Sequence, residues 1–503
     1  MSITVSQQQA MDGAVRHLVS HYNPQGNRVG WLMMASILVE AWDLYGIAFV
    51  LVFIREQYHP APLLLGLAGA GTQGGAIVGA MLGGWLSDKI GRRVMFLATM
   101  VMFIILAIAQ AFVPSVLWLV VIRFALGVPL GSDISTGYTY IMDSMPKGAR
   151  EVMGNRWQFM FAVGEVLTLA VIAVFIVADL PHETIWRVTL ALGALPALVI
   201  LVMRHDLPET AVWLVRRGRF REAKRVAKSM FGDDLAMLPD QDAAVAKPRP
   251  SVFLADIRKD PIRWRATLYG WIACFAQGSE FSTFAFYLPT LFVMVGVSSI
   301  LGTDLVTMLL YVIAAISGWV GPMLLPKIGH RGIGIAGFGI VFLSLLVAAW
   351  ALFSGNTMVL CIIAAISGWV GPLITPKIGH RGIGIAGFGI VFVSLLVAAW
   401  ALYTGKTYIL PFAAATMLWG HYWDASNCMT IPTVVAKPEY RGTASGFAYM
   451  FVKLPSFLAI FLFPSLFAAI GQAGATLFVA IFPLIGLLAA LFILPEIYGY
   501  EHD

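Results

Sequence analysis

Charged residues are scarce in this chain. Only 12% of its 503 residues are Asp, Glu, Lys or Arg, while 59% are hydrophobic. A soluble protein of this size carries about 25% charged residues, because its surface must face water. The shortage of charge argues against a soluble globular protein, and the surplus apolar surface is expected to face lipid.

Cysteine and catalytic motifs are scarce as well. The three cysteines, Cys274, Cys361 and Cys428, all lie in apolar runs, so we expect neither a disulfide framework nor a metal site. The chain has no phosphate-cradling GxxxxGK[ST] loop and no nucleophile elbow. These absences argue against an enzyme and an ATP-driven pump, and we expect no cofactor.

The net charge of +6 does not indicate a nucleic-acid partner, because the basic residues are spread over short loops between apolar runs. The positive-inside rule explains this distribution. The loops expected on the cytoplasmic side carry Lys89, Arg92, Arg93, Lys147, Arg150, Lys327, Arg331, Lys377, Arg381, Lys437 and Arg441. This pattern predicts that both termini are cytoplasmic and that the first span is retained.

Apolar runs of the length of a membrane helix, about 20 residues, recur along the whole chain. Six precede a long basic segment and eight follow it, at 30–54, 62–86, 94–113, 115–143, 152–178 and 185–204, then 266–296, 303–325, 333–353, 358–375, 383–403, 408–434, 443–469 and 473–494. They predict an all-α polytopic membrane protein with about 14 crossings. The expected parts are a cytoplasmic tail (1–29), a six-helix bundle (30–204), a cytoplasmic central loop (205–265), a C-terminal helix bundle (266–495) and a tail (496–503).

An internal repeat accounts for two of these crossings. Residues 313–352 and 363–402 match at 36 of 40 positions, with an offset of 50. Without one copy, twelve helices remain in two groups of six. We therefore expect an extra helix pair at the periphery, because a bundle of two halves has no vacancy in its core.

Several motifs resemble those of the major facilitator superfamily. The stretch from Gly84 to Arg93 (GWLSDKIGRR) is similar to the superfamily's signature between helices 2 and 3, and LPET at 207–210 resembles the sugar-porter-like signature after helix 6. The stretch from Gly127 to Asp133 resembles the helix-4 motif of the phosphate:proton and metabolite:proton symporters. The resemblance implies two six-helix bundles with a solute site between them.

The resemblance also implies a conformational gate at the cytoplasmic helix ends. Charges there would pair when the inside is closed and separate when it opens. Ordinary positive-inside charge would explain the arginines but not Asp88. The residues assigned to the gate are Gly84, Asp88, Gly91, Arg92, Arg93, Arg123, Arg150 and Arg441.

Asp43 and Asp133 are carboxylates inside predicted membrane helices, where an ionised group is costly. Asp43 is in the first helix and Asp133 in the fourth, and both are assigned to proton coupling, with Glu40, one turn before Asp43, as a further choice. The alternative is a structural carboxylate bonded to a neighbouring helix. Arg123 is the expected counter-ion of Asp133, or else an anchor at a helix end.

Lys453 lies deep in the run 443–469 and needs a partner. That partner would be an anionic solute, or else Asp424 or the membrane surface. The other residues assigned to solute binding are the polar and aromatic side chains of two runs: Gln277, Glu280, Thr283 and Tyr287 in one, and Trp423, Asp424 and Asn427 in the other. Interfacial tryptophans and helix–helix hydrogen bonds are the alternative interpretation.

Together these features predict a monomeric secondary transporter of the inner membrane that binds lipid, protons and a small solute. The favoured function is proton-coupled symport of a small organic anion, a carboxylate metabolite, by alternating access. A sugar or polyol carrier and a phosphate:proton symporter are the alternatives, and a transport-inactive receptor is a further one. Phosphate is disfavoured because Ile134, Phe161, Ser279 and Thr283 depart from the phosphate group's pattern.

Overall fold

The computed structural model shows a helical protein. It describes residues 5–20, 23–146, 153, 156–245, 250–294, 299–305, 307–308, 311–312, 371–406, 409–410, 413, 416–417, 421 and 428–495. Within these residues the regular elements are α-helices and short 3-10 turns, without a strand. The all-α class predicted from the sequence is confirmed for this part of the chain.

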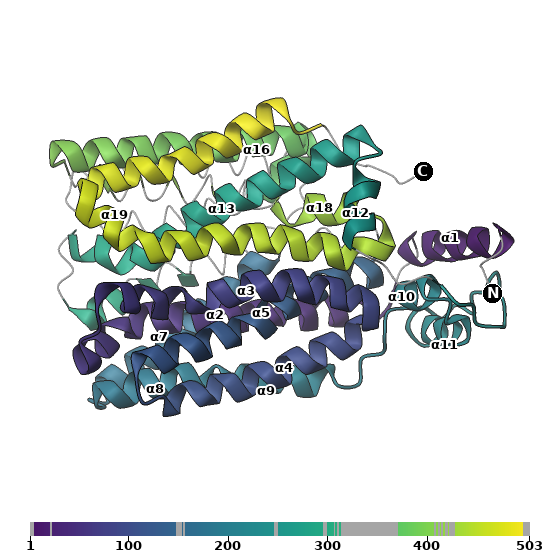
Figure 1. Cartoon of the computed structure of the whole chain (residues 1–503), viewed down its shortest axis with the longest axis horizontal. Helices are drawn as coiled ribbons and strands as arrows, with labels where there is room; N and C mark the ends of the chain where they lie inside the picture. Colours follow the sequence, from purple (N-terminus) through teal and green to yellow (C-terminus); the bar gives the residue numbers. More distant parts are fainter. Residues whose placement is uncertain are drawn as a thin grey trace.

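The first half of the chain forms a bundle of long helices (Figure 1), which follow the six predicted runs closely. They are α2 (Gly26–Tyr58), α3 (Pro62–Ile90), α4 (Arg92–Ala109) with the 3-10 turn η1 (Gln110–Phe112), α5 (Val116–Ser144), α7 (Trp157–Val177), α8 (His182–Leu192) and α9 (Ala194–Arg204). The last predicted run is divided between α8 and α9, which meet at Gly193. Trp42 of α2 packs beside this junction.

The described helices of the second half lie against the first bundle (Figure 1). They are α13 (Pro261–Met294), α16 (Gly371–Thr404), α18 (Thr430–Val435), the 3-10 turn η3 (Pro438–Tyr440) and α19 (Arg441–Phe492). α19 contains two crossings joined at Gly471, where φ is 71° and ψ is 176°. Glycine tolerates this positive φ, and the break falls between the two predicted runs 443–469 and 473–494.

Among the described residues, nine helices are long and apolar enough to cross a membrane. The repeat copy at 313–352 and residues 363–370 of the second copy lie outside the described residues, so the count of fourteen stays a prediction. A loop predicted around Lys377 and Arg381 is wrong, because α16 continues as helix through it. At about 1.5 Å per residue its 34 residues span ~50 Å, more than the hydrocarbon core of ~30 Å. The first turns of α16 therefore extend beyond the hydrocarbon core of the membrane. Basic residues there can face water while they remain in the helix.

Small residues allow α3 and α5 to touch. A Cβ atom on Gly75 would lie 1.9 Å from the carbonyl oxygen of Phe124, and one on Gly127 would lie 2.0 Å from that of Thr72. Only glycine permits such an approach. The close helix contact predicted from Gly127 and Gly131 is confirmed, and it buries the polar side chains of α5 within the bundle.

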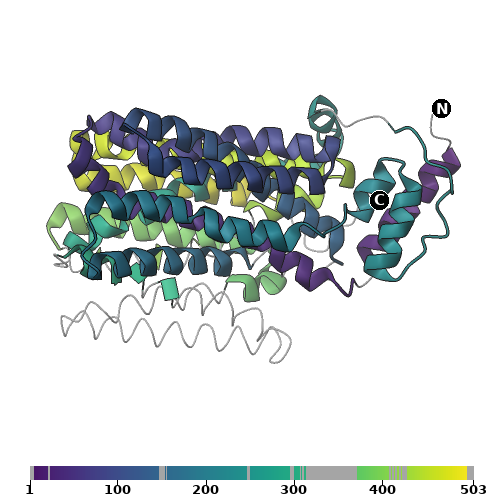
Figure 2. The same ribbon diagram turned by 90° about the horizontal axis from the view of Figure 1, so that it is seen from below.

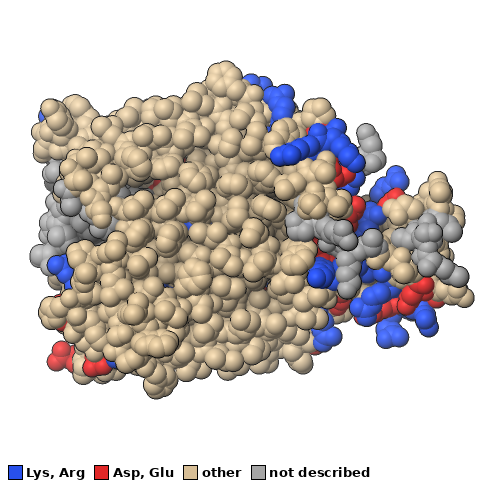
Figure 3. All heavy atoms as spheres, in the orientation of Figure 1, with Lys and Arg blue, Asp and Glu red and all other residues tan. Residues whose placement is uncertain are grey.

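Charge gathers at one end of the molecule, which we call the basic end (Figure 3). Four short helices lie there, α1 (Val5–Ser20), α10 (Ala211–Arg216), α11 (Phe220–Phe231) and α12 (Pro250–Ile257). α1 and α11 project beyond the bundle (Figure 2). The predicted central loop 205–265 therefore contains helices.

The flank of the bundle is almost free of charge on the face shown in Figure 3. The exposed large hydrophobic side chains of the described residues include Leu117, Trp118 and Val121. A soluble protein rarely exposes such an extended apolar surface, so this flank faces lipid. The positive-inside rule predicts that the basic end is cytoplasmic.

Candidate functional site

A small cavity lies between the two halves of the bundle. Its volume is about 50 Å³, which is room for a few water molecules at most. Its walls come from α2, α5 and α7 on one side and from α13, α19 and the residues before α18 on the other. The polar and reactive side chains in the wall are Glu40, Tyr138, Gln277, Ser282, Cys428, Tyr449, Lys453 and Ser456. In the described part of the chain, the two halves therefore meet around this cavity.

Glu40 of α2 and Lys453 of α19 form an ion pair in the wall of this cavity. Their side chains are 7% and 6% exposed, so each charge depends on the other for compensation. The Lys453 ammonium also lies 4.9 Å from the centre of the Tyr449 ring. From the sequence, Glu40 was predicted to take part in proton coupling and Lys453 in solute binding. The structure brings these two side chains together. Asp424, the alternative partner of Lys453, lies outside the described residues, so that pairing stays a prediction.

A histidine joins two of the predicted site residues on α13. His421 Nδ1 lies 3.0 Å from Glu280 Oε1, and His421 Nε2 lies 3.4 Å from Gln277 Nε2. All three side chains are buried. Gln277 also reaches the cavity, so this residue of the predicted polar face of α13 borders the interface between the halves.

Six predicted residues lie outside the part of the chain that can be described. The structure gives the helix but not the side chains of Thr283 and Tyr287, and it does not describe Arg150, Trp423, Asp424 or Asn427. Their assignment stays a prediction.

Asp43 forms a buried, bidentate ion pair with Arg123 of α5. The Arg123 Nη1 and Nη2 atoms lie 3.1 and 3.0 Å from the two Asp43 oxygens. Arg123 also donates to Gln110 and to the carbonyl of Ala68. Arg123 was expected as the counter-ion of Asp133 or as a helix-end anchor, and both interpretations are wrong. Ten residues separate Arg123 from Asp133 along α5, about 15 Å, which is beyond the reach of the side chain.

The counter-ion of Asp133 is Arg204, at the end of α9. Arg204 Nη1 lies 3.1 Å from both carboxylate oxygens of Asp133. The hydroxyls of Ser36 and Thr99 also donate to this carboxylate. Arg204 and Asp133 are fully buried, so the pair ties α2, α4, α5 and α9 together. This is the arrangement expected of a structural carboxylate, and a proton-coupling role for Asp133 stays a prediction.

At the basic end, Asp88 of α3 caps the first turn of α19. Its carboxylate accepts hydrogen bonds from the Gly442 N–H (3.1 Å), the Thr443 N–H (2.7 Å) and the Thr443 hydroxyl (2.7 Å). Arg92 pairs with the same carboxylate at 3.0 Å. The first N–H groups of a helix have no partner within the helix and favour an anion. Asp88 therefore fixes the end of a second-half helix to the first half.

Asp143 at the end of α5 completes this contact between the halves. Its carboxylate lies 3.3 Å from Arg92 Nε and 3.3 Å from Arg441 Nη1. α3 and α19 also touch through their backbones, because a Cβ atom on Gly84 would lie 2.2 Å from the Gly442 carbonyl oxygen. We call Gly84, Asp88, Arg92, Asp143, Arg441, Gly442 and Thr443 the basic-end gate. It is closed in this structure.

The sugar-porter-like segment, residues 207–213, packs against the gate at the basic end. Glu209 accepts a hydrogen bond from the Arg93 N–H at 3.1 Å, and the position of Gly91, with φ of 112°, leaves room for the Glu209 carboxylate. Burial raises the pKa of Glu209, although Arg92 opposes the effect. Trp213 donates to the Asp88 carbonyl at 3.0 Å.

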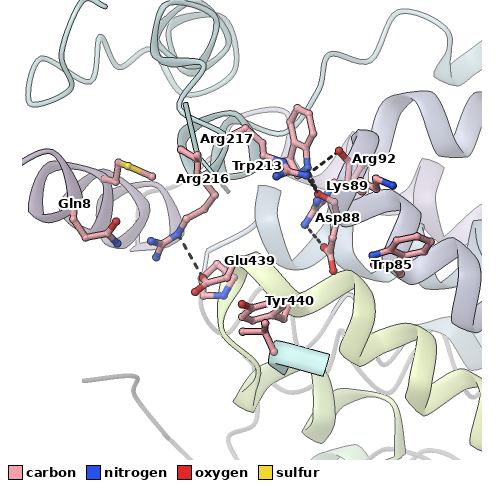
Figure 4. A pocket seen from close by; sticks show the side chains of 14 residues that line it. Gln8, Trp85, Asp88, Lys89, Arg92, Trp213, Arg216, Arg217, Glu439 and Tyr440 are labelled. Carbon is pink, nitrogen blue, oxygen red and sulfur yellow. Dashed lines mark hydrogen bonds and ion pairs between the residues drawn. The ribbon is translucent and has the colours of Figure 1, made fainter. Parts of the chain in front are cut away.

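Trp213, Asp88 and Arg92 border a hollow of about 770 Å³ at the basic end, which is also lined by Trp85, Arg216 and Glu439 (Figure 4). Of the predicted gate residues, Arg123 does not belong here, because its partner is Asp43. Gly84, Asp88, Gly91, Arg92, Arg93 and Arg441 do lie together at this end.

Sequence reasoning missed three buried polar residues. Arg204 resembled ordinary positive charge at a helix end. Glu165 of α7 is 1% exposed, and Asp143 of α5 is 2% exposed. The signal for Glu165 was a single acidic residue inside an apolar run, the same signal that identified Asp43. Among the described residues, no group of side chains has the composition of a metal site.

Comparison with known proteins identifies transporters. The family described as "Sugar (and other) transporter" matches residues 32–371. The inner membrane metabolite transport protein YgcS of Escherichia coli (strain K12) is 26% identical over 322 residues, which cover 64% of this chain and 70% of YgcS. The niacin transporter NiaP of Acinetobacter baylyi is 27% identical over 316 residues, 61% of this chain and 69% of NiaP.

Solved structures show the same fold. The proton:xylose symporter XylE of E. coli superposes with a TM-score of 0.66, covering 93% of this chain and 96% of XylE at 20% identity. At this level of identity the likeness concerns the fold, which is that of the major facilitator superfamily.

Proposed function

The chain belongs to the Sugar (and other) transporter family of the major facilitator superfamily, and from this premise we propose that it carries a small organic anion together with protons. The solute is a carboxylate metabolite, and the transport is symport across the inner membrane by alternating access. The relatives and the fold are those of membrane transporters of metabolites, not of enzymes.

The observation that supports an anionic solute is the position of Lys453. A buried ammonium lies at the interface of the two halves, in the wall of the central cavity. Its only ion-pair partner among the described residues is Glu40. A solute carboxylate can replace the Glu40 carboxylate at this ammonium and supply an equivalent ion pair. NiaP, among the relatives, is named for niacin, which is a carboxylic acid.

The same exchange links the solute to a proton. Once a solute carboxylate occupies Lys453, Glu40 remains buried without its cation. An isolated carboxylate in such a site binds a proton rather than stay ionised. One anion and one proton therefore enter together, and the charge of the site is unchanged. Asp43, which is held by Arg123, is a second candidate for proton binding.

The basic-end gate provides the conformational step. Its hydrogen bonds and ion pairs hold α19 against α3 while the cavity is shut. Opening requires that Asp88 release the first turn of α19. Solute and proton then leave toward the side that the basic residues predict to be cytoplasmic.

A sugar or polyol carrier is the second candidate function. The family description names sugars, and the amide of Gln277 in the cavity wall can bind hydroxyl groups. Phosphate is a further candidate, since it also is an anion that Lys453 could bind. An anion carrier requires the Lys453 ammonium for binding, whereas a sugar carrier does not.

Uptake by proteoliposomes tests the proposal. The panel consists of nicotinate, benzoate, nicotinamide, xylose and phosphate, each offered with an inward proton gradient. The proposal predicts accumulation of the organic acids but not of nicotinamide, and loss of this uptake in Lys453→Gln. Uptake of xylose that survives Lys453→Gln would establish the sugar carrier instead. Phosphate uptake without uptake of the organic acids would point to the phosphate symporter.

A further inference from the structure

Glu165 is a buried carboxyl with no cation beside it among the residues that the structure describes. It is the one ionisable residue of α7 and is 1% exposed. Its Oε1 atom has no hydrogen-bond partner, and the carboxyl interacts with the hydroxyl of Tyr45. Gly164 explains the burial, because a Cβ atom there would lie 2.5 Å from the Leu38 carbonyl oxygen, so α7 and α2 touch beside Glu165.

Of the described helices packed against α7, all charged side chains except one form ion pairs elsewhere. Those of α2 and α8 form the ion pairs Arg28–Asp206, Glu40–Lys453, Asp43–Arg123, Glu56–His182 and Glu183–Arg187. The remaining one, Arg55, is exposed near the end of α2. In the described part of the chain, the Glu165 carboxyl is therefore surrounded by buried residues, and its polar neighbour is the Tyr45 hydroxyl.

Tyr45 connects Glu165 to the other half of the molecule. The Tyr45 and Tyr311 hydroxyls lie 2.7 Å apart, and their rings meet edge to face. Tyr45 also packs edge to face against Phe161, which lines the central cavity one turn before Glu165. A chain of polar groups therefore runs from Glu165 through two tyrosines across the interface between the halves.

We propose that Glu165 is a further proton-binding site of this transporter, separate from Glu40 and Asp43. In the closed state the carboxyl is protonated, because an ionised carboxylate would have, among the described residues, neither a cation nor a full set of hydrogen bonds. When the halves separate, the Tyr45–Tyr311 bond breaks and water reaches Oε1. The proton then passes from the carboxyl to water on one side of the membrane and is replaced from water on the other, so no further reactant is needed.

Infrared spectroscopy of the purified protein tests the protonation state directly. The wild type should show the C=O stretching band of a neutral carboxylic acid at neutral pH, and Glu165→Gln should lose it. Glu56→Gln, which removes a half-exposed carboxyl, should keep it. Tyr45→Phe should shift the band, which gives a second measurement if Glu165→Gln does not fold. A band that is unchanged in Glu165→Gln and in Tyr45→Phe would overturn the proposal.

Transport tests the consequence, and only this part rests on the proposed function. With the membrane potential clamped at zero, one proton fewer per cycle lowers the nicotinate accumulation ratio about tenfold for each pH unit of gradient. Glu165→Gln should show this loss while nicotinate exchange persists. Wild-type accumulation in Glu165→Gln would contradict the proposal. If no panel solute is transported at all, the proposed function fails, while the infrared result still decides the protonation of Glu165.

Discussion

Asp88→Asn should open the basic-end gate. The Asp88 carboxylate accepts three hydrogen bonds from Gly442 and Thr443 and pairs with Arg92. Asparagine has nearly the same shape and keeps one acceptor oxygen, but it removes the negative charge from the start of α19. The substitution therefore weakens the contact between the halves and leaves the rest of each half intact.

The size of the effect follows from these contacts. Hydrogen bonds that involve a charged group contribute about 1.5–3 kcal/mol. Loss of one such contribution raises the population of the open gate roughly 10- to 100-fold, since about 1.4 kcal/mol corresponds to a factor of ten.

The native Cys428 provides the assay, because it is buried and lines the central cavity. In a background with Cys274→Ala and Cys361→Ala, a maleimide supplied from the basic end should label Cys428 about 10- to 100-fold faster in Asp88→Asn than in the parent. Asp206→Asn is the matched control, because Asp206 forms an exposed pair with Arg28 at the same end. Equal labelling rates in Asp88→Asn and the parent would refute the role of this carboxylate in closing the gate.

Three further predictions concern stability. Arg204→Gln leaves Asp133 buried without its cation, which should lower the free energy of unfolding by about 3–5 kcal/mol in denaturant titrations. Adding Asp133→Asn should recover part of this loss, and no recovery would contradict the pairing. Gly84→Ala should lower the melting temperature through a cost of about 1–3 kcal/mol, whereas Gly389→Ala, where the nearest atom would lie 3.8 Å away, should not. Burial raises the pKa of Glu209 above 4.5, so the folded state keeps this proton to a higher pH than the unfolded state. The free energy of unfolding should therefore fall as the pH rises from 4.5 to the raised pKa. Glu209→Gln should flatten that part of the pH–stability curve.

Hydrophobic runs predicted the helices well, because a membrane helix must satisfy its backbone internally and expose apolar side chains. The break at Gly471 falls where the runs are interrupted. The prediction of a loop around Lys377 was wrong. Charged residues limit only the part of a helix that can lie in lipid. They do not mark where the helix ends.

The site residues were predictable one by one, but their partners were not. A charge inside an apolar run identifies Glu40, Asp43 and Lys453 from the sequence alone. The pairing of Glu40 with Lys453, 413 positions apart, depends on how two bundles face each other, which no local pattern encodes. Arg204 was missed for the same reason, since a basic residue at the end of a run has the same local pattern whether it faces water or a buried carboxylate.

In the proposed cycle, a solute carboxylate takes the place of Glu40 at Lys453, and Glu40 then binds a proton. This exchange can be measured by titrating the purified protein in weakly buffered solution with the best-transported acid of the panel, and with its amide as the neutral control, while the pH is recorded. We expect proton uptake when the acid binds to the wild type, none with the amide, and less uptake per bound acid in Glu40→Gln. Binding of the acid without proton uptake, or equal uptake in Glu40→Gln, would contradict the account.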